Sequence, residues 1–390
     1  MIELLVGMAL GLLTTVIIAQ VIINADANRQ TTTSGSDAQV NGALAMFSLT
    51  RDLQSAGFGM MSHDAAPGCP IRAKRGTNAE ISGLYLTPVY RTGDSSGNLT
   101  NLRLLSAGGS QVVPPMVLSA DHGQLGSSFG IKLALAVPLD QNLTYARKAD
   151  VLIAIPVTWT QATPGTFGAT DQWCTVFEAA ADSANPLSTT TLPHVTRSPG
   201  WNPTADATST LMPKNGYATG DYIVNLGRLV IRDYWLQNEN LMTHELQDDG
   251  SWGEDQIVAS GIVAMQVLYG KDTLTSSAAT PSVVDTYDTT TPTTVTDWRR
   301  VLSVRIALVA RSSNREKDVV TSQDVYWDVG NANTVTVGST SASACPNATA
   351  RSCIKLALPR ASNTDTEWQH YRYKVFDTVV PLRNMLWRAS

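Results

Sequence analysis

The sequence predicts an α+β protein in which a long N-terminal helix docks on a large β-rich globular head with long loops. Leu4 to Ile23 is a run of 20 residues without a charged side chain. All 18 prolines lie at Pro67 or beyond, so a helix can continue up to the glycines near residue 58. Beyond residue 60 the apolar residues recur with the two-residue period of strands. We therefore expect a helix over residues 1–59 and a β-rich head over residues 60–390.

The first half of the helix is expected to be embedded in a membrane. As a helix, the uncharged run is about 30 Å long, which is one hydrocarbon thickness. A cleaved secretory signal would need a basic start, a shorter apolar core and a small-residue cleavage site, and the sequence has none of the three. We therefore expect a retained transmembrane helix over about residues 4–23.

Three residues in or next to this run are candidates for a specific role. Glu3 costs free energy at the start of an apolar helix unless it reaches water, polar head groups or a cation. The positive end of the helix dipole favours the head-group position, and a partner cation is the alternative. Gly7 and Gly11 form a G-x-x-x-G pair that would let another helix approach closely within lipid, although chance also produces such pairs in a chain with 28 glycines.

The second half of the helix is expected to be amphipathic. Residues 31–36, TTTSGS, combine β-branched residues with a Ser-Gly-Ser break, which predicts a weak or unwound stretch just outside the membrane. Asp37 could cap the helix that follows. An apolar stripe at three- and four-residue spacing then predicts the surface that docks on the head, and it consists of Val40, Ala43, Leu44, Phe47, Leu53 and Ala56.

The head is expected to contain strands separated by polar loops. The strand-like segments are 81–90, 102–105, 131–137, 151–159, 222–236, 257–269, 301–311 and 371–382. Three stretches rich in Thr, Ser, Ala, Pro and Gly, at 160–219, 271–297 and 328–352, are too long for hairpin turns. We expect them to be loop excursions on the surface.

The composition excludes nucleic-acid binding and favours an exported protein. Charged residues make up only 16% of the chain, and 28 basic against 33 acidic residues give a net charge of -5. The longest basic clusters are pairs such as Arg299-Arg300, whereas binding to DNA or RNA needs clustered Lys and Arg. Low charge with abundant Gly, Pro, Thr and Ser is typical of strands and polar loops.

The four cysteines favour disulfides. An even number in an exported chain suits disulfide bonds, and we favour Cys345 with Cys353 and Cys69 with Cys174. Free thiols are the alternative. No histidine lies beside a cysteine and there is no C-x-x-C, so we expect no metal site built from cysteines and no cofactor.

Two motifs resemble catalytic sites without the context that catalysis needs. Gly126 to Gly130 matches G-x-S-x-G around Ser128, but no apolar strand precedes it and a strand-like segment rather than a helix follows. His244-Glu245 opens like H-E-x-x-H, but Asp248 occupies the last position and the surroundings predict a hairpin.

One acidic segment is a weak candidate for calcium. Four carboxylates in eight residues could bind the ion through oxygen ligands, but their spacing is not that of an EF-hand loop. We favour the alternative that the segment is a polar turn between the strands ending near Leu246 and starting at Ile257. The candidate ligands are Asp248, Asp249, Glu254 and Asp255.

Five segments in order resemble the PilW-like minor pilins of type IV pili. They are IELLVGMALGLL, NGALAMFSLTRDLQSAGFG, IVASGIVAMQVLYG, WRRVLSVRIALVARS and YKVFDTVVPLRN. The resemblance runs from end to end, with the loops unmatched. The opening resembles the helix common to prepilins and pseudopilins, and RDLQSAGF, VRIALVARS and VVPLRN narrow the resemblance to the subfamily.

The resemblance implies a non-enzymatic role in pilus assembly, in which the helix anchors the protein in the inner membrane and then packs in the filament. Glu3 would correspond to the acidic residue that meets the N-terminal amine of a neighbouring subunit. The implied partners are other minor pilins, the major pilin, a large tip adhesin and the inner membrane. The basic leader of the family is not in this sequence, so we hypothesise that the start is internal and that a leader upstream would be cut by prepilin peptidase.

Two rival functions remain open at this stage. A J-type pseudopilin of a type II secretion system would have the same helix. A membrane-anchored exported hydrolase would use Ser128 with one of the five histidines.

Overall fold

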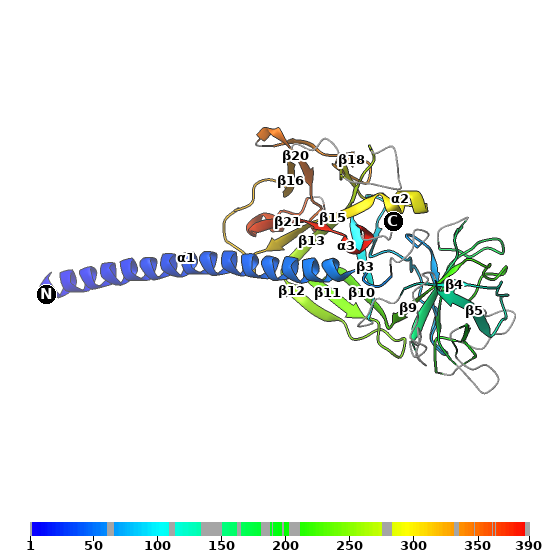
Figure 1. Ribbon diagram of the computed structural model, residues 1–390. Coiled ribbons are helices and arrows are strands. Elements are labelled where there is room, and N and C mark those ends of the chain that lie inside the picture. The colour runs from blue at the N-terminus through cyan, green and yellow to red at the C-terminus, as the bar shows by residue number, and fades with distance from the viewer. Residues whose placement is uncertain are drawn as a thin grey trace.

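The computed structural model describes most of the chain as one long helix and a mostly β head (Figure 1). The described residues are 2–60, 66–108, 114–133, 150–161, 165–180, 188, 190–196, 199–202, 211–274, 283–330, 335–346, 348–360, 362 and 364–386. Within them the fold is α+β, as the sequence predicts.

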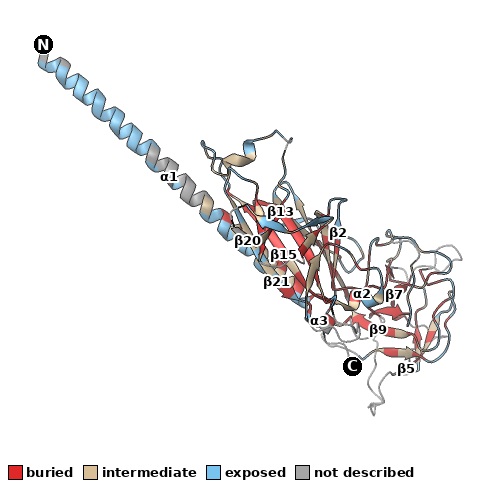
Figure 2. Cartoon of the chain, turned by 90° about the horizontal axis from the view of Figure 1, so that it is seen from above, coloured by how far each residue is buried: buried red, intermediate tan, exposed pale blue. Residues whose placement is uncertain are grey.

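Helix α1 (Ile2–Ser55) is a single α-helix that projects from the head (Figures 1 and 2). Its segment Val6–Ile23 is long and apolar enough to cross a membrane, and none of that segment is buried in the molecule. The helix continues through residues 31–36, where the sequence predicts a weak or unwound stretch. One glycine costs a helix interior only about 1 kcal/mol, so the backbone hydrogen bonds on both sides outweigh the local preference.

The part of the head against which α1 lies, called here the proximal lobe, contains three sheets. Their strand orders are β12-β11-β10-β3-β2, β18-β17-β14-β13-β15-β21 and β16-β20-β19. The first sheet consists of β2 (Val89–Gly93), β3 (Leu99–Ala107), β10 (Leu229–Gln237), β11 (Asn240–Glu245) and β12 (Gln256–Ser260). The second consists of β13 (Ile262–Lys271), β14 (Thr286–Asp288), β15 (Val301–Arg311), β17 (Val335–Val337), β18 (Thr340–Ser341) and β21 (Tyr373–Pro381). The third consists of β16 (Tyr326–Gly330), β19 (Ser343–Cys345) and β20 (Ala348–Lys355).

Short helical turns complete the proximal lobe. They are α2 (Val295–Arg299), the 3-10 helix η1 (Glu367–His370) and α3 (Arg383–Leu386).

The distal lobe lies on the side of the head away from the N-terminus of α1 (Figure 1). It contains one sheet with the order β1-β7-β6-β9-β4-β5-β8. Its strands are β1 (Ile71–Arg72), β4 (Met116–Leu118), β5 (Ser128–Leu133), β6 (Val151–Ile155), β7 (Cys174–Glu178), β8 (Thr191–Pro193) and β9 (Tyr222–Gly227).

Apart from β1, which precedes β2 in the chain, the distal lobe is inserted between two paired strands of the proximal lobe. Strands β3 and β10 are antiparallel neighbours, with Ala107 opposite Leu229, and β4 to β9 lie between them in the chain. Side chains on one face of the distal sheet, such as Ile153 and Val224, belong to the same hydrophobic core as α1 and the proximal sheets. The other face has a core of its own around Phe129, Phe177 and Tyr217.

The structure corrects the expected division into strands and loops. The three stretches expected to be loops contain regular structure. Residues 160–219 contain β7 and β8, and residues 271–297 contain β14 and the start of α2. Residues 328–352 contain most of β16, all of β17 to β19 and the start of β20. Short strands of two to five residues carry too few alternating apolar positions to stand out from a Thr- and Ser-rich sequence. The expected strand over 81–90 is mostly irregular, and only its end belongs to β2. The end of the expected strand over 131–137 lies outside the described residues.

Candidate functional site

The face of α1 that packs on the head consists of small and aliphatic residues. It contacts β3, β12, β15 and β21. Its buried residues recur at three- and four-residue spacing, and they are Ala38, Gly42, Ala45, Leu49 and Leu53, with Ala56 continuing the pattern directly after the helix. The ring of Phe376 on β21 lies where a side chain at residue 42 would start, since a Cβ there would be 2.0 Å from the ring atom Cε2.

This packing corrects the docking stripe expected from the sequence. Leu53 and Ala56 are buried as expected, but Val40, Leu44 and Phe47 are 62%, 50% and 66% exposed. The expectation followed the largest apolar side chains, whereas small residues allow the closest approach of a helix to a sheet. The pattern Ala38, Gly42, Ala45 and Leu49 in the sequence was the signal that could have identified the packed face.

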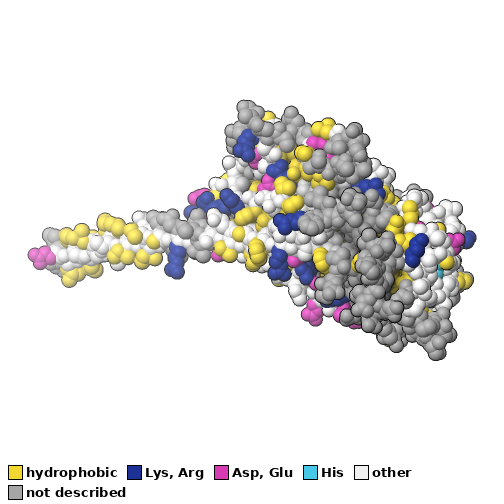
Figure 3. Space-filling model, viewed as in Figure 1, with side chains coloured by type: hydrophobic (Ala, Val, Ile, Leu, Met, Phe, Trp, Pro, Cys, Tyr) yellow, Lys and Arg dark blue, Asp and Glu magenta, His cyan; other side chains and the backbone are white. Residues whose placement is uncertain are grey.

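Val40, Leu44 and Phe47 therefore form an uncovered face, called here the outer stripe. Their spacing of four and three residues places them on one side of the helix. Apolar side chains also lie along the projecting part of α1 (Figure 3). Within the described residues, α1 thus exposes apolar surface both in the segment Val6–Ile23 and beside the head. An exposed apolar surface of this kind marks contact with a membrane or with another protein.

The residues singled out at the start of α1 are exposed. Glu3 lies in the first turn of the helix. At Gly7 and Gly11 an added Cβ would meet nothing within 4 Å. No part of the described chain covers these three residues, so any partner they have comes from outside the molecule.

An ionic network fastens α1 to the five-stranded sheet. Asp52 of α1 accepts hydrogen bonds from Arg232 and from the hydroxyl of Tyr234 on β10. Arg232 also donates to Glu245 at 2.5 Å, and Glu245 accepts a further bond from Arg228 at 3.1 Å. Burial and the adjacent Asp52 carboxylate raise the pKa of Tyr234 to about 12, so this hydroxyl remains a donor. The network fixes the rotation of α1 about its axis and hence the direction of the outer stripe.

The end of α1 is held by the C-terminal segment. The side-chain amide of Asn384 in α3 donates to the backbone carbonyl of Ala56 at 2.7 Å. This bond satisfies one of the carbonyls that a helix leaves without an intrahelical partner at its C-terminus. Asp52 and Asn384 belong to the segments RDLQSAGF and VVPLRN, so two of the segments that narrowed the resemblance serve to fasten the helix to the head.

A groove of about 590 Å³ runs between α1 and strands β10 to β12. Leu44 and Phe47 of the outer stripe line it, together with Arg51 and Ile257. Ile257 is 60% exposed, so the apolar surface of α1 continues onto β12. The uncovered surface is therefore formed by helix and head together.

The structure does not build a nucleophile elbow around Ser128. Ser128 begins β5, where it lies opposite Pro193, so the motif leads into a strand rather than a helix. Among the described residues no hydrogen bond joins Ser128 to a histidine. The nearby imidazoles of His122 and His194 instead meet each other, with 2.9 Å between their Nε2 atoms.

His244 and Glu245 lie on the strand β11 rather than on a helix. His244 is 3.0 Å from Asp255 through Nδ1 and stacks on Trp252. Glu245 is part of the ionic network under α1. The pair therefore lacks the helical geometry of a zinc protease.

Three of the four calcium candidates are bonded within the protein. Asp248 pairs with Arg228 at 2.6 Å, Asp249 accepts from Ser251, and Asp255 meets His244. In the part of the chain that the structure describes, one group of three metal-ligating side chains lies close together, namely Asp328, Cys345 and Cys353. The two sulfurs of that group are bonded to each other, which removes them as thiolate ligands.

The structure contains the disulfides Cys69–Cys174 and Cys345–Cys353, the two pairs that the sequence favours. The first joins the segment before β1 to the start of β7, so it ties the distal sheet to the chain that leaves α1. The second closes a loop of 8 residues between β19 and β20.

Fold and site together define an α+β protein whose uncovered N-terminal helix is compatible with a single-pass membrane anchor. Residues 229–384 match the family model of type IV pilus-assembly protein W, which supports a PilW-like pilus assembly protein. The matched segment runs from β10 to α3, so it contains most of the surface on which α1 packs. Neither curated proteins nor solved structures gave a match to the chain.

Proposed function

We propose that this chain is a PilW-like minor pilin that takes part in type IV pilus assembly, in a tip or initiation complex with other minor pilins. The observation that carries the proposal is the match of residues 229–384 to the PilW family. The uncovered apolar surface of α1 supports it, because a subunit of a filament needs a surface that other subunits cover.

The proposed mechanism is assembly without catalysis. Before assembly, Val6–Ile23 lies in the inner membrane and the head lies in the periplasm. In the filament, the same apolar surface packs against the major pilin and other minor pilins. Glu3 would pair with the N-terminal amine of a neighbour and set the axial position of the subunit, because a carboxylate in an apolar bundle needs a cation. A large adhesin is the expected partner of the head at the tip.

Deletion of the gene tests this proposal. We expect the deletion to reduce the number of surface pili and expect the wild-type protein, supplied from a plasmid, to be present in pili sheared from the cells. Restored piliation without the protein in the sheared fraction would place it in the assembly machinery instead. Unchanged piliation, together with loss of secretion of a type II substrate, would favour the J-type pseudopilin.

A further inference from the structure

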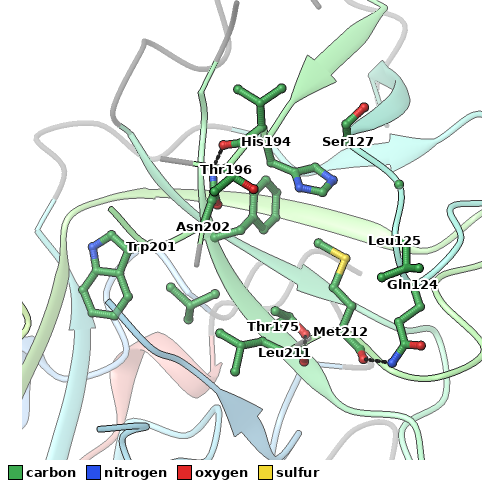
Figure 4. A pocket seen from close by; sticks show the side chains of 14 residues that line it. Gln124, Leu125, Ser127, Thr175, His194, Thr196, Trp201, Asn202, Leu211 and Met212 are labelled. Atoms are coloured by element: carbon green, nitrogen blue, oxygen red, sulfur yellow. Dashed lines mark hydrogen bonds between the residues drawn. The ribbon is translucent and has the colours of Figure 1, made fainter. Parts of the chain in front are cut away.

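A pocket in the distal lobe has no role in the proposed assembly function. It lies between the loop before β5, strand β7 and the segments around His194 and Met212 (Figure 4). Its volume is about 120 Å³. The pocket is in the inserted lobe, outside residues 229–384, so its use does not depend on the PilW match.

Buried apolar side chains form the floor of the pocket, and uncharged polar side chains lie both beside them and at the rim. The apolar floor consists of Val176, Phe177, Trp201, Leu211 and Met212. The polar side chains are Gln124, Ser127, Thr175, His194, Thr196 and Asn202. Among the polar residues, Thr175, His194 and Asn202 are buried, whereas Ser127 and Thr196 are exposed at the rim. No Lys, Arg, Asp or Glu belongs to the described lining. In Figure 4, His194, Thr196 and Ser127 lie on one side of the open space, and Leu211, Met212 and Gln124 on the other.

His194 adds an uncharged imidazole to the polar part of the pocket lining. Its imidazole meets that of His122 at 2.9 Å and packs against the rings of Phe129 and Phe177. Burial and the neighbouring His122 lower the pKa of His194 to about 3. The imidazole is therefore neutral at ordinary pH.

These features restrict the ligand. A charged molecule would lose its hydration in the pocket without gaining a counter-charge, which disfavours its binding. An apolar cavity of about 150 Å³ accepts a benzene ring, so this somewhat smaller pocket has room for no more than one six-membered ring, whose edge lies at the mouth. Polar groups at the mouth of an apolar pocket fix a ligand that carries a matching polar group at its edge.

We propose that this pocket binds an uncharged six-membered ring that carries a hydroxyl group. The ring lies on the floor formed by Phe177, Leu211 and Met212. The hydroxyl lies at the rim, within reach of Ser127 and Thr196. An aromatic alcohol and a neutral sugar share this chemistry, and the experiment separates them.

The test uses the full chain in detergent micelles with the methyl groups of its methionines labelled with 13C. The signal of Met212 is assigned through Met212→Leu. Phenol and methyl α-glucoside are titrated separately, and benzoate serves as the charged counterpart of phenol. We expect at least one neutral ring to shift the Met212 signal saturably, and benzoate to leave it unchanged. No shift with either neutral ring, or an equal shift with benzoate, would overturn the proposal.

A second experiment fills the pocket with a larger side chain. Thr196→Phe places a ring at the rim, and we expect it to weaken binding of the neutral ring at least tenfold. The matched control is Thr92→Phe at an exposed position of β2 in the proximal lobe, which should leave binding unchanged. If Thr196→Phe does not fold, Ser127→Phe replaces it. If a variant with the added phenylalanine folds and still binds the neutral ring with unchanged affinity, the proposal is contradicted.

Discussion

At the scale of single residues, Gly42 is the position on which the packing of α1 depends most directly. An added methyl group would collide with the ring of Phe376, so Gly42→Ala should destabilise the protein by about 1–3 kcal/mol. Urea unfolding of the full chain in detergent, followed by tryptophan fluorescence, measures the effect.

Gly35 in the same helix is the matched control. A Cβ there would meet nothing within 4 Å. Because alanine is the better helix former by about 1 kcal/mol, Gly35→Ala should be neutral or stabilising. Equal losses at both positions would show that the close approach of Phe376 to α1 is not what requires glycine at residue 42.

The pair His122 and His194 makes the distal lobe sensitive to acid. Burial lowers the pKa of His122 from 6.5 to about 4, and burial with the neighbouring His122 lowers that of His194 to about 3. The unfolded chain therefore binds more protons below pH 6.5. The neutral pair contributes stability that is fully present above pH 6.5 and is lost as the pH falls toward 4.

Thermal unfolding between pH 4 and pH 7 tests this dependence. We expect the wild-type protein to lose on the order of a few kcal/mol over this range, and His122→Gln with His194→Gln to lose clearly less. His370→Gln is the control, because His370 is only half-buried and lies in the proximal lobe, away from the pair. A double variant with the full acid sensitivity of the wild type would contradict the assignment.

At the scale of elements, α1 has one face that packs on the head and another that is exposed, and the proposed function assigns assembly to the exposed face. Leu49 is fully buried, so Leu49→Ala should cost about 2–5 kcal/mol. Leu44→Ser with Phe47→Ser changes exposed side chains and should change stability by less than about 1 kcal/mol. We nevertheless expect the double variant to be depleted from sheared pili, measured against its level in the membrane. Normal incorporation would exclude the outer stripe from the assembly surface.

The sequence predicted the existence of this helix, but not its continuity through residues 31–36 or which side of it faces the head. A long run without charged residues or proline favours a helix through local preferences alone, so the helix can be recognised directly in the sequence. The packed side depends on the shape of β15 and β21, which favours Gly42 and Ala45 over Phe47. The role of Asp52 in fastening α1 to the head could not be predicted, because its partners Arg232 and Tyr234 lie 180 residues or more away along the chain.

The same contrast between local preferences and long-range contacts explains which strands the sequence predicted. Strand β15 is an almost continuous apolar run, and its limits, Val301 and Arg311, are those expected from the sequence. The short strands β7, β8, β14, β16 and β17 exist because neighbours distant in the sequence supply their hydrogen bonds. Tertiary pairing of this kind leaves little periodic signal in a local stretch of sequence. Strands β18 and β19 instead pair with the adjacent strands β17 and β20.

At the scale of the whole molecule, the two disulfides should differ in their contribution to stability. Cys69 and Cys174 are 105 residues apart, whereas Cys345 and Cys353 are 8 apart. Loop-closure entropy predicts a loss of about 4–5 kcal/mol for Cys69→Ser with Cys174→Ser, and of about 2–3 kcal/mol for Cys345→Ser with Cys353→Ser. Urea unfolding of the two double variants gives the comparison. The reverse order would mean that the long crosslink does not restrain the unfolded chain.

The whole molecule combines α1 and the surface on which it packs with a distal lobe. Helix α1 and the sheets of residues 229–384 supply the ionic network and the uncovered apolar surface. The distal lobe adds a second core and a neutral pocket at the far side of the head. The surfaces proposed for assembly and for ligand binding are therefore separate, so we expect variants of one to leave the other intact.

The central claim is that this chain is a pilus subunit whose start is held in the filament by Glu3. The most direct measurement is the amount of the protein in sheared pili from a strain in which Glu3→Leu is the only copy, relative to its amount in the inner membrane. We predict normal membrane levels and a loss of at least tenfold from the sheared fraction, with fewer pili on the cells. Incorporation and piliation equal to those of the wild type would contradict the account.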